Sequence, residues 1–310
     1  MNAAGGRAET FSEPLLEWFG RHGRTQLPWR TLLDPYRTVV SEFMLQQTQV
    51  ERVVPLFRAF VARWPSFAAL AAASQADVVR AWRGLGYNSR AVRLRELAKI
   101  VCERYGGELP RDVAALRALP GVGPYTARAI AAFAFGANVA AVDTNVRRIV
   151  HRTQFGVEWP PLATASQLDA IALELVPAGA AWAFNSAMMD LGATVCTARA
   201  PKCLLCPLQI ACAAAPLAPA ELSRLAALHA PVRGGQARIP FEETDRFVRG
   251  RVVDRLRELP PDRRISLLAL HAELAPVLAR HDARAFEAVV ASLARDRIVD
   301  DSDGGLRLAQ

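Results

Sequence analysis

The chain carries the stretch Leu119-Pro120-Gly121-Val122-Gly123-Pro124-Tyr125-Thr126 between two segments with helical periodicity. Its two glycines permit a tight turn with positive φ, and Pro124 suits the first position of the helix that follows. The backbone N–H groups at the start of that helix can hold a phosphate. An isolated Gly-x-Gly turn usually only connects two helices, so the rest of the sequence must decide between these interpretations.

Helical periodicity continues on both sides of this turn. Apolar residues recur at three and four positions, with Gly and Pro at the breaks. This pattern predicts helices at 9–30, 36–49, 50–63, 67–72, 75–83, 88–105, 112–118 and 124–135. The first 215 residues are therefore predicted to be all-α.

The C-terminal third changes in character. Residues 216–245 are rich in Ala, Pro and Gly and are predicted to be a linker. Helices at 243–258, 267–278 and 284–295, then two short strands around an Asp/Gly turn, outline a small winged-helix-like α+β module over 246–310. Such modules often bind DNA, and one of the helices carries Arg246, Arg249, Arg251, Arg255 and Arg257. We expect this module to add DNA affinity.

Composition bounds the class of protein. With 310 residues, 52% of them apolar and 22% charged, the chain is globular and long enough for about two domains. The net charge of +8 favours a polyanionic partner, although the base composition of the genome could equally produce this arginine content. No apolar run reaches the length of a membrane span, and the N-terminus lacks the order of a secretory signal. We expect a cytoplasmic enzyme with no membrane partner.

Four of the five cysteines are closely spaced. They follow the pattern C-x6-C-x2-C-x5-C at Cys196, Cys203, Cys206 and Cys212. In a reducing compartment this spacing predicts a metal centre rather than disulfides. By chemistry alone, four thiolates fit zinc and an iron–sulfur cluster equally well.

Two carboxylates stand in positions that suit acid–base chemistry. The neighbours of Glu42 at three and four residues are Thr38, Val39, Leu45 and Gln46, which do not form a charged surface. A carboxyl group in apolar surroundings keeps its proton longer and can act as a general acid near neutral pH. Asp143 precedes a predicted helix, so it is a candidate N-cap, and it could also stabilise a cationic sugar.

Several of these motifs resemble one enzyme superfamily. The cysteine pattern, with Pro201-Lys202 and Pro207 interleaved, resembles the iron–sulfur loop of endonuclease III and the adenine DNA glycosylases. The turn at 119–126, followed by Asp143, resembles the helix-hairpin-helix plus Gly/Pro-Asp signature of that superfamily. Over about residues 12–215 the chain is most similar to the adenine DNA glycosylases, notably at 27–30, 41–48, 84–87 and 184–193.

The resemblance implies an all-α helix-hairpin-helix glycosylase fold of two helical subdomains. It implies a glycosylase domain over 1–215, with a loop at 196–212 in which the four cysteines hold a 4Fe-4S cluster. Its activity would be base excision repair, with release of adenine opposite 8-oxoguanine or guanine from double-stranded DNA that contains a mismatched or damaged base pair. The enzyme would be monofunctional, and we expect a monomer associated with the nucleoid.

The resemblance also implies roles for individual residues. Glu42 would protonate the purine, Asp143 would stabilise the sugar cation, and Tyr125 and Asn145 would support the site. The base must leave the helical stack to be reached. The residues implied to contact DNA or line the base pocket are Trp29, Arg30, Leu45, Gln46, Gln47, Thr48, Val50, Tyr87, Gly121 and Gly123.

The chain also departs from the family patterns. Tyr125 stands where endonuclease III carries a catalytic lysine, so a Schiff-base lyase reaction lacks its amine. Thr144, Ser186 and Asn88 replace residues usual in adenine glycosylases, whose C-terminal module is normally Nudix-like. A mismatch thymine/uracil glycosylase that acts on T:G or U:G is therefore an alternative. A non-catalytic DNA-damage-binding protein is a second one, disfavoured by the presence of both carboxylates.

Overall fold

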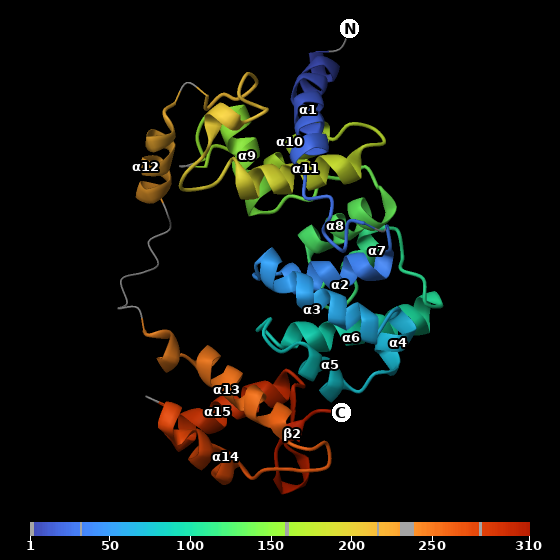
Figure 1. Cartoon of the computed structure of the whole chain (residues 1–310), viewed down its shortest axis with the longest axis vertical. Helices are drawn as coiled ribbons and strands as arrows, with labels where there is room; N and C mark the ends of the chain where they lie inside the picture. Colours follow the sequence, from blue (N-terminus) through green and yellow to red (C-terminus); the bar gives the residue numbers. More distant parts are fainter. Residues whose placement is uncertain (1–2, 32, 159–160, 216, 230–238, 279–280) are drawn as a thin grey trace. The chain divides into compact units, whose positions relative to one another are not determined.

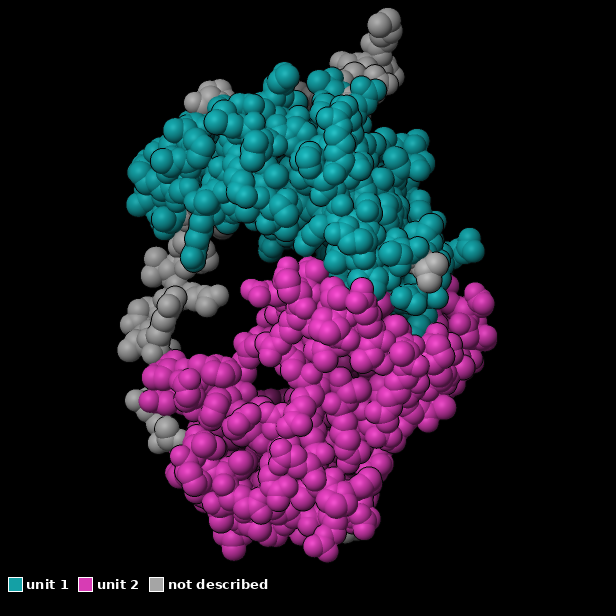
Figure 2. Space-filling view, in the orientation of Figure 1, with its two compact units in different colours: residues 1–42, 110–118, 122–233 teal, residues 43–109, 119–121, 234–310 magenta. Residues whose placement is uncertain are grey.

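The computed structural model describes residues 3–31, 33–158, 161–215, 217–229, 239–278 and 281–310, and this part of the chain is predominantly helical (Figure 1). It divides into two compact units (Figure 2). Unit 1 comprises residues 1–42, 110–118 and 122–233, and unit 2 comprises residues 43–109, 119–121 and 234–310. No described helix combines the length and apolar character needed to cross a bilayer.

Unit 1 is built on apolar helix faces. Phe11, Leu15 and Phe19 of the first helix are buried in one cluster with Phe184 and Met188. Its elements are α1 (Ala3–His22), the larger part of α2 (Pro35–Leu45), α7 (Val113–Arg117), α8 (Pro124–Phe135), α9 (Thr144–Phe155), α10 (Ala165–Glu174), α11 (Ala181–Thr194), the 3-10 turn η1 (Cys203–Leu205) and α12 (Pro219–His229). The burial of this cluster keeps α1 and α11 in contact.

Unit 2 combines a helical segment with the C-terminal module. Two of its short helices begin where serine side chains cap them: Ser66 and Ser74 accept hydrogen bonds from the backbone N–H groups of Ala69 and Asp77. The elements are α3 (Val50–Arg63), α4 (Phe67–Ala72), α5 (Gln75–Ala81), α6 (Ser89–Tyr105), η2 (Phe241–Glu243), α13 (Asp245–Glu258), α14 (Leu267–Leu274), η3 (Ala275–Val277), α15 (Ala283–Arg295), β1 (Val299–Asp300), η4 (Ser302–Gly304) and β2 (Arg307–Leu308).

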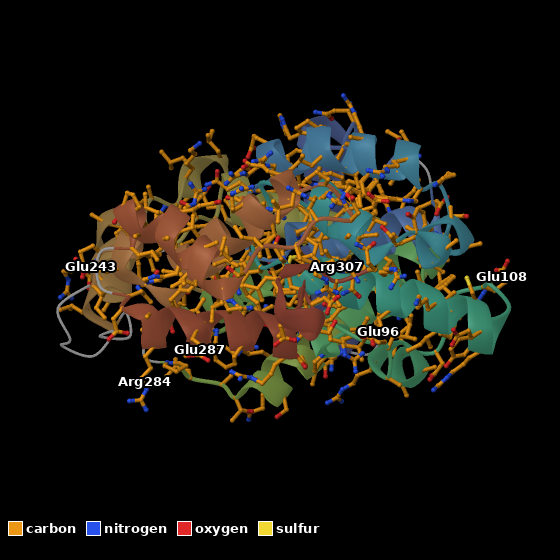
Figure 3. All side chains as sticks on the ribbon, turned by 90° about the horizontal axis from the view of Figure 1, so that it is seen from below. Glu96, Glu108, Glu243, Arg284, Glu287 and Arg307 are labelled. Atoms are coloured by element: carbon orange, nitrogen blue, oxygen red, sulfur yellow. The ribbon has the colours of Figure 1, made fainter. Side chains whose placement is uncertain are left out.

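The C-terminal module (residues 246–310) has the predicted order of three helices and a hairpin. β1 and β2 pair antiparallel, with Val299 opposite Leu308. Arg307, labelled in Figure 3, donates to Asp300 at 2.9 Å across the hairpin. Within unit 2, the module is tied to α6 by an ion pair at 2.8 Å between Arg297 and Glu96.

The predicted helices 50–63, 67–72 and 124–135 are confirmed at both ends. The prediction of one helix over 9–30 is wrong beyond residue 22. The backbone N–H of Arg24 donates to the carboxylate of Asp190 at 2.9 Å instead of to a helical carbonyl, so α1 ends at His22. The helix predicted over 267–278 ends at Leu274, because Pro276 cannot continue it.

The predicted linker is wrong in part. Residues 219–229 form α12, which begins at a proline and carries an ion pair at 2.7 Å between Arg224 and Glu221. The Arg233-Gly234-Gly235 segment of that linker lies outside the described residues. The predicted boundaries of the glycosylase domain, the linker and the C-terminal module stay a prediction, since unit 2 joins the module to residues of the expected glycosylase domain.

Candidate active site

Glu42 lies on α2 with only 8% of its surface exposed. Burial, reinforced by the negative charge of Asp143, raises the pKa of the Glu42 carboxyl from 4.5 to about 7. A hydrogen bond from Tyr125 and the positive charge of Arg30 oppose this rise and only reduce it. Glu42 is therefore a carboxylic acid that holds its proton near neutral pH, as the apolar sequence context predicted.

Tyr125 is placed by the turn that opens α8. Gly123 is the N-cap residue of this helix, Pro124 is its first residue, and Tyr125 follows directly. Burial and the nearby carboxylates of Glu42 and Asp143 raise the pKa of Tyr125 well above its usual value of 10. The phenol therefore keeps its proton and serves as a hydrogen-bond donor to Glu42.

Asp143 is the N-cap residue of α9, as the sequence predicted. Its Oδ1 accepts hydrogen bonds from the backbone N–H groups of Asn145 and Val146, each at 2.8 Å. The side-chain amide of Asn145 donates to Oδ2 at 3.0 Å. These donors, at the N-terminal end of a helix, hold the Asp143 side chain in one orientation.

Asn145 is itself held by a contact that the sequence did not reveal. The guanidinium of Arg148 donates to Asn145 Oδ1 at 2.8 Å, to the carbonyl of Gly192 at 2.7 Å and to the carbonyl of Cys196 at 2.7 Å. A Cβ on Gly192 would lie 2.5 Å from the Cβ of Asn145, a distance that real side chains do not tolerate. The absence of a side chain at Gly192 therefore allows α11 to pack against the start of α9.

Asn185 fixes the strand-like segment that leads to Asp143. Its Oδ1 accepts the backbone N–H of Ala141 at 2.7 Å, and its Nδ2 donates to the carbonyls of Val139 and Ala181 at 2.9 and 2.8 Å. This side-chain amide is buried. It supplies hydrogen-bond partners to backbone groups of the extended segment that have no partner in a helix or sheet. The family pattern at 184–193 contains this residue, but sequence reasoning assigned it no role.

Arg30 makes its closest polar contacts with Asp190. Its guanidinium donates to both carboxylate oxygens, at 2.7 and 3.2 Å, and Arg24 donates to the same carboxylate at 2.8 Å. Burial disfavours the Asp190 anion, yet the hydrogen bonds and charges of Arg30 and Arg24 prevail and lower its pKa. Base contacts by Arg30 and by the partly buried Trp29 stay predictions.

Seven of the residues implied to contact DNA belong to unit 2. Within that unit, the buried guanidinium of Arg90 donates to the carbonyls of Phe43 and Gln46 at 2.7 and 2.6 Å, and to that of Leu85 at 2.9 Å. One arginine thus joins the end of α2 to the loop before α6, and sequence reasoning missed it. The seven residues are Leu45, Gln46, Gln47, Thr48, Val50, Tyr87 and Gly121.

Three of these seven have a backbone of positive φ: Gln47 (+56°), Tyr87 (+45°) and Gly121 (+76°). Only glycine adopts such values without strain, and strained residues cluster at functional sites. At Gly121 the glycine is also required by space, because a Cβ there would lie 2.8 Å from the ring of Phe43. The positive φ predicted for the turn is confirmed at this glycine, whereas Gly123 adopts −84°.

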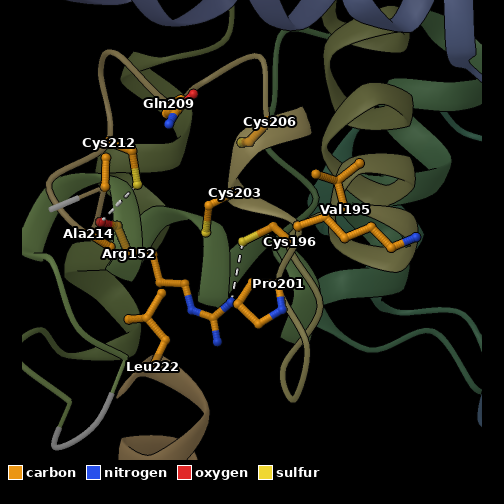
Figure 4. A pocket seen from close by; sticks show the side chains of 12 residues that line it. Arg152, Val195, Cys196, Pro201, Cys203, Cys206, Gln209, Cys212, Ala214 and Leu222 are labelled. Carbon is orange, nitrogen blue, oxygen red and sulfur yellow. Dashed lines mark hydrogen bonds between the residues drawn. The ribbon is translucent and has the colours of Figure 1, made fainter. Parts of the chain in front are cut away.

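The four predicted metal ligands lie together in unit 1. Cys196, Cys203, Cys206 and Cys212 line one small cavity (Figure 4). Arg152 donates to the Sγ of Cys196 at 3.5 Å, and its carbonyl accepts from the Sγ of Cys212 at 3.5 Å. Among the described residues, no three His, Cys, Asp or Glu side chains are grouped to hold a single metal ion. Four thiols around one cavity nevertheless suit a larger group that takes four sulfur ligands.

Comparisons with known proteins agree with this arrangement. The family of HhH-GPD superfamily base excision DNA repair proteins matches residues 40–178. An adenine DNA glycosylase from Mycolicibacterium smegmatis is 45% identical over 246 residues, which are 79% of each chain. An adenine DNA glycosylase from Homo sapiens is 42% identical over 214 residues, which are 66% of this chain and 39% of the human one.

Solved structures give the same fold. A thermostable thymine-DNA glycosylase superposes with a TM-score of 0.64 at 32% identity, over 70% of this chain and 100% of that one. An endonuclease III in a non-covalent complex with DNA superposes with a TM-score of 0.58 at 22% identity, over 70% of this chain and 98% of that one. The helical fold inferred from the sequence is thereby confirmed.

Proposed function

The chain belongs to the adenine DNA glycosylases of the HhH-GPD superfamily of base excision DNA repair proteins, and from this premise we propose that it removes adenine opposite 8-oxoguanine or guanine in duplex DNA. The observation that carries the proposal is the pairing, within unit 1, of a protonated Glu42 with a carboxylate at Asp143. When an N-glycosidic bond breaks, negative charge develops on the leaving base and positive charge on the sugar. The acid neutralises the first charge and the carboxylate stabilises the second.

The reaction needs a proton on the leaving base and negative charge beside the sugar. Glu42 donates its proton to a ring nitrogen of adenine as the bond to C1′ breaks, and the electron pair of that bond leaves with the base. The Asp143 carboxylate stabilises the cationic sugar. Water then adds to C1′, and the proton it releases returns to the Glu42 carboxylate, which leaves an abasic site.

The surrounding residues prepare this chemistry. Tyr125 donates a hydrogen bond to Glu42 and so orients the acid. Asn145 donates to Oδ2 of Asp143, the carboxylate oxygen that does not cap α9. The side chains of this site carry no amine that could form a Schiff base with the sugar. The enzyme therefore releases the base without cutting the strand.

A 4Fe-4S cluster held by Cys196, Cys203, Cys206 and Cys212 forms part of the proposal. Support comes from the thiol-lined cavity and from the resemblance of the spacing to the iron–sulfur loop of this superfamily. When bound, the cluster would fold the loop that carries Arg199 and Lys202. Both side chains are positively charged and are therefore attracted by DNA phosphates. It takes no part in the excision steps described above.

The test of specificity is a panel of duplexes. Purified protein is incubated with A, T or U placed opposite G, 8-oxoguanine or C, and base release is followed by alkaline cleavage of the abasic strand. We expect adenine to be released opposite 8-oxoguanine and G. Release of only thymine and uracil opposite G would instead make the protein a mismatch thymine/uracil glycosylase, the candidate favoured by the 32% identity to a thymine-DNA glycosylase.

A non-catalytic role is tested by the same panel. Tight binding of duplexes without release of any base would support a DNA-damage-binding protein. The Glu42→Gln variant controls for contaminating glycosylases, because it differs from the wild type only at the proposed acid.

A further inference from the structure

Unit 2 contains a cleft of about 740 Å³ whose arginines have no role in the proposed reaction. It is lined by the 47–49 turn, Arg52 of α3, the loop 84–89, Phe241 of η2, one side of α13 from Arg246 to Arg257, and Leu293 and Ile298. The C-terminal module therefore forms one wall of this cleft, and the segment that follows α2 forms another.

The α13 arginines are mostly neutralised by carboxylates. Arg251 and Arg257 each pair with Asp254 at 2.7 Å, and Arg255 pairs with Glu273 at 2.6 Å. Arg249 pairs with Asp296. The sequence-based expectation of a row of DNA-binding arginines on α13 is therefore weakened for four of the five.

Arg246 is the exception on α13. Among the residues that the structure describes, no carboxylate lies within ion-pair distance of its guanidinium, and the same holds for Arg52 across the cleft. Both side chains are exposed and both line the cleft. Two uncompensated positive charges in one cleft form a site for an anion, and in a DNA-binding protein the available anion is a phosphodiester.

Arg246 also contacts the loop that carries Tyr87. Its guanidinium carbon lies 4.2 Å from the centroid of the Tyr87 ring and 6.0 Å from that of Phe241. A guanidinium over an aromatic face is held in place and keeps its charge. Tyr87, whose backbone has a positive φ, and Arg246 thus contact each other in the lining of the cleft.

The module is fixed at this position by Arg257. Its guanidinium donates to the carbonyl of Val79 at 2.9 Å and to the side chain of Asn88 at 2.8 Å, and only 6% of the side chain is exposed. A buried arginine that satisfies groups on both sides holds α13 and the loop 84–89 at a constant separation. The cleft is therefore a built feature of unit 2.

We propose that Arg246 and Arg52 each bind one phosphate of the DNA strand in this cleft, so that the C-terminal module contributes one specific phosphate contact through Arg246. The inference rests on the proposed function only in that duplex DNA is the ligand. The proposed ligand is a phosphate of the DNA backbone, which is present in undamaged duplex as well.

The test measures how salt weakens DNA binding. The dissociation constant of the full-length protein for a fluorescein-labelled 25-mer duplex is determined by anisotropy between 50 and 400 mM KCl, for wild type, R246A, R246K, R52A and the R52A/R246A double variant. The matched control is R284A. Arg284 is an exposed arginine of the same module, and its side chain projects outward from the ribbon of that module in Figure 3. Each protein is also tested on an undamaged duplex of the same length.

Each lost phosphate contact should reduce the steepness of the plot of log dissociation constant against log [KCl] by about 0.9. It should also raise the dissociation constant at 100 mM KCl by roughly eightfold. We expect this change for R246A and for R52A, twice the change in slope for the double variant, and wild-type slopes for R246K and R284A. Single-turnover excision at saturating enzyme should stay within about twofold of wild type, because neither Arg246 nor Arg52 takes part in the proposed excision steps.

A slope for R246A equal to that of R284A would overturn the proposal. The same result would follow from an R246K slope as low as that of R246A, because a lysine also neutralises one phosphate. Failure of the proposed function is a separate outcome, since a wild-type protein that releases no base still yields the salt slopes on the undamaged duplex.

Discussion

Replacement of Glu42 by Gln should make the protein more stable while it removes the chemistry. Burial and Asp143 raise the pKa of Glu42 from 4.5 to about 7, and each pH unit of such a rise is worth about 1.4 kcal/mol. Ionisation of Glu42 therefore costs the folded state about 3 kcal/mol. Gln has nearly the same shape, can accept the hydrogen bond from Tyr125 and never ionises.

The sign of the pH dependence follows from proton binding. Between pH 4.5 and about 7 the folded chain binds this proton more tightly than the unfolded chain does. Its contribution to the free energy of unfolding is therefore complete below pH 4.5 and is lost as the pH rises through 7. Wild type and Glu42→Gln should be equally stable near pH 4.5, and the variant should be more stable by up to about 3 kcal/mol at pH 8.

The assay is thermal unfolding by circular dichroism from pH 5 to 8.5, combined with single-turnover excision. For about 150 to 250 residues, about 3 kcal/mol corresponds to a Tm difference of about 6 to 12 °C at pH 8. Excision by Glu42→Gln should fall by about two to four orders of magnitude at unchanged duplex affinity, and wild-type excision should decline above pH 7. Glu13→Gln, an exposed change on α1, controls for the loss of one charge.

Equal Tm values for wild type and Glu42→Gln at pH 8 would refute the assignment of Glu42 as the buried acid. Excision by the variant at the wild-type rate would refute the mechanism even if the stability changed as expected.

Four further outcomes are expected. Asp143→Asn should lower excision by about two to three orders of magnitude and destabilise the fold by about 1 kcal/mol, whereas Asp112→Asn at the cap of α7 should affect only the Tm; equal excision by both variants would contradict the catalytic role. Gly192→Ala should displace Asn145 and reduce excision, while Gly20→Ala, which meets open space, should have no effect; a fully active Gly192→Ala would show that the packing yields. Anaerobically purified wild type should contain iron and acid-labile sulfide and Cys203→Ala should lose both, whereas zinc without sulfide would exclude the cluster. Borohydride should trap no covalent enzyme–DNA adduct, and efficient trapping would count against a monofunctional enzyme.

Local patterns predicted much of the fold. The helices at 50–63, 67–72 and 124–135 were predicted correctly because their breaks coincide with residues of known effect, such as the Ser66 cap and Pro124. The end of α1 and the helix α12 were missed for physical reasons. A carboxylate 166 residues away competes for the N–H of Arg24, and an Ala- and Pro-rich composition suits a linker as well as a short helix.

The same limit applies to the site. The apolar neighbours of Glu42 predicted its burial, and the position of Asp143 before a helix predicted its cap, because both signals are local. Most partners of Arg90, Arg148 and Asp190 are carbonyls and guanidiniums far away in the sequence, so no spacing could indicate them. Long-range polar contacts were therefore what sequence reasoning missed.

The paired arginines of α13 bear on how such a protein would search a genome. An arginine already matched by a carboxylate releases few counterions when DNA approaches, so it adds little to the affinity for undamaged base pairs. Low affinity for ordinary sequence shortens each encounter and leaves the molecule free to inspect the next stretch. The chain's isoelectric point near 9.8 gives the balance of charges but not which arginines are available to phosphates, and the ion pairs of α13 favour short encounters over long residence.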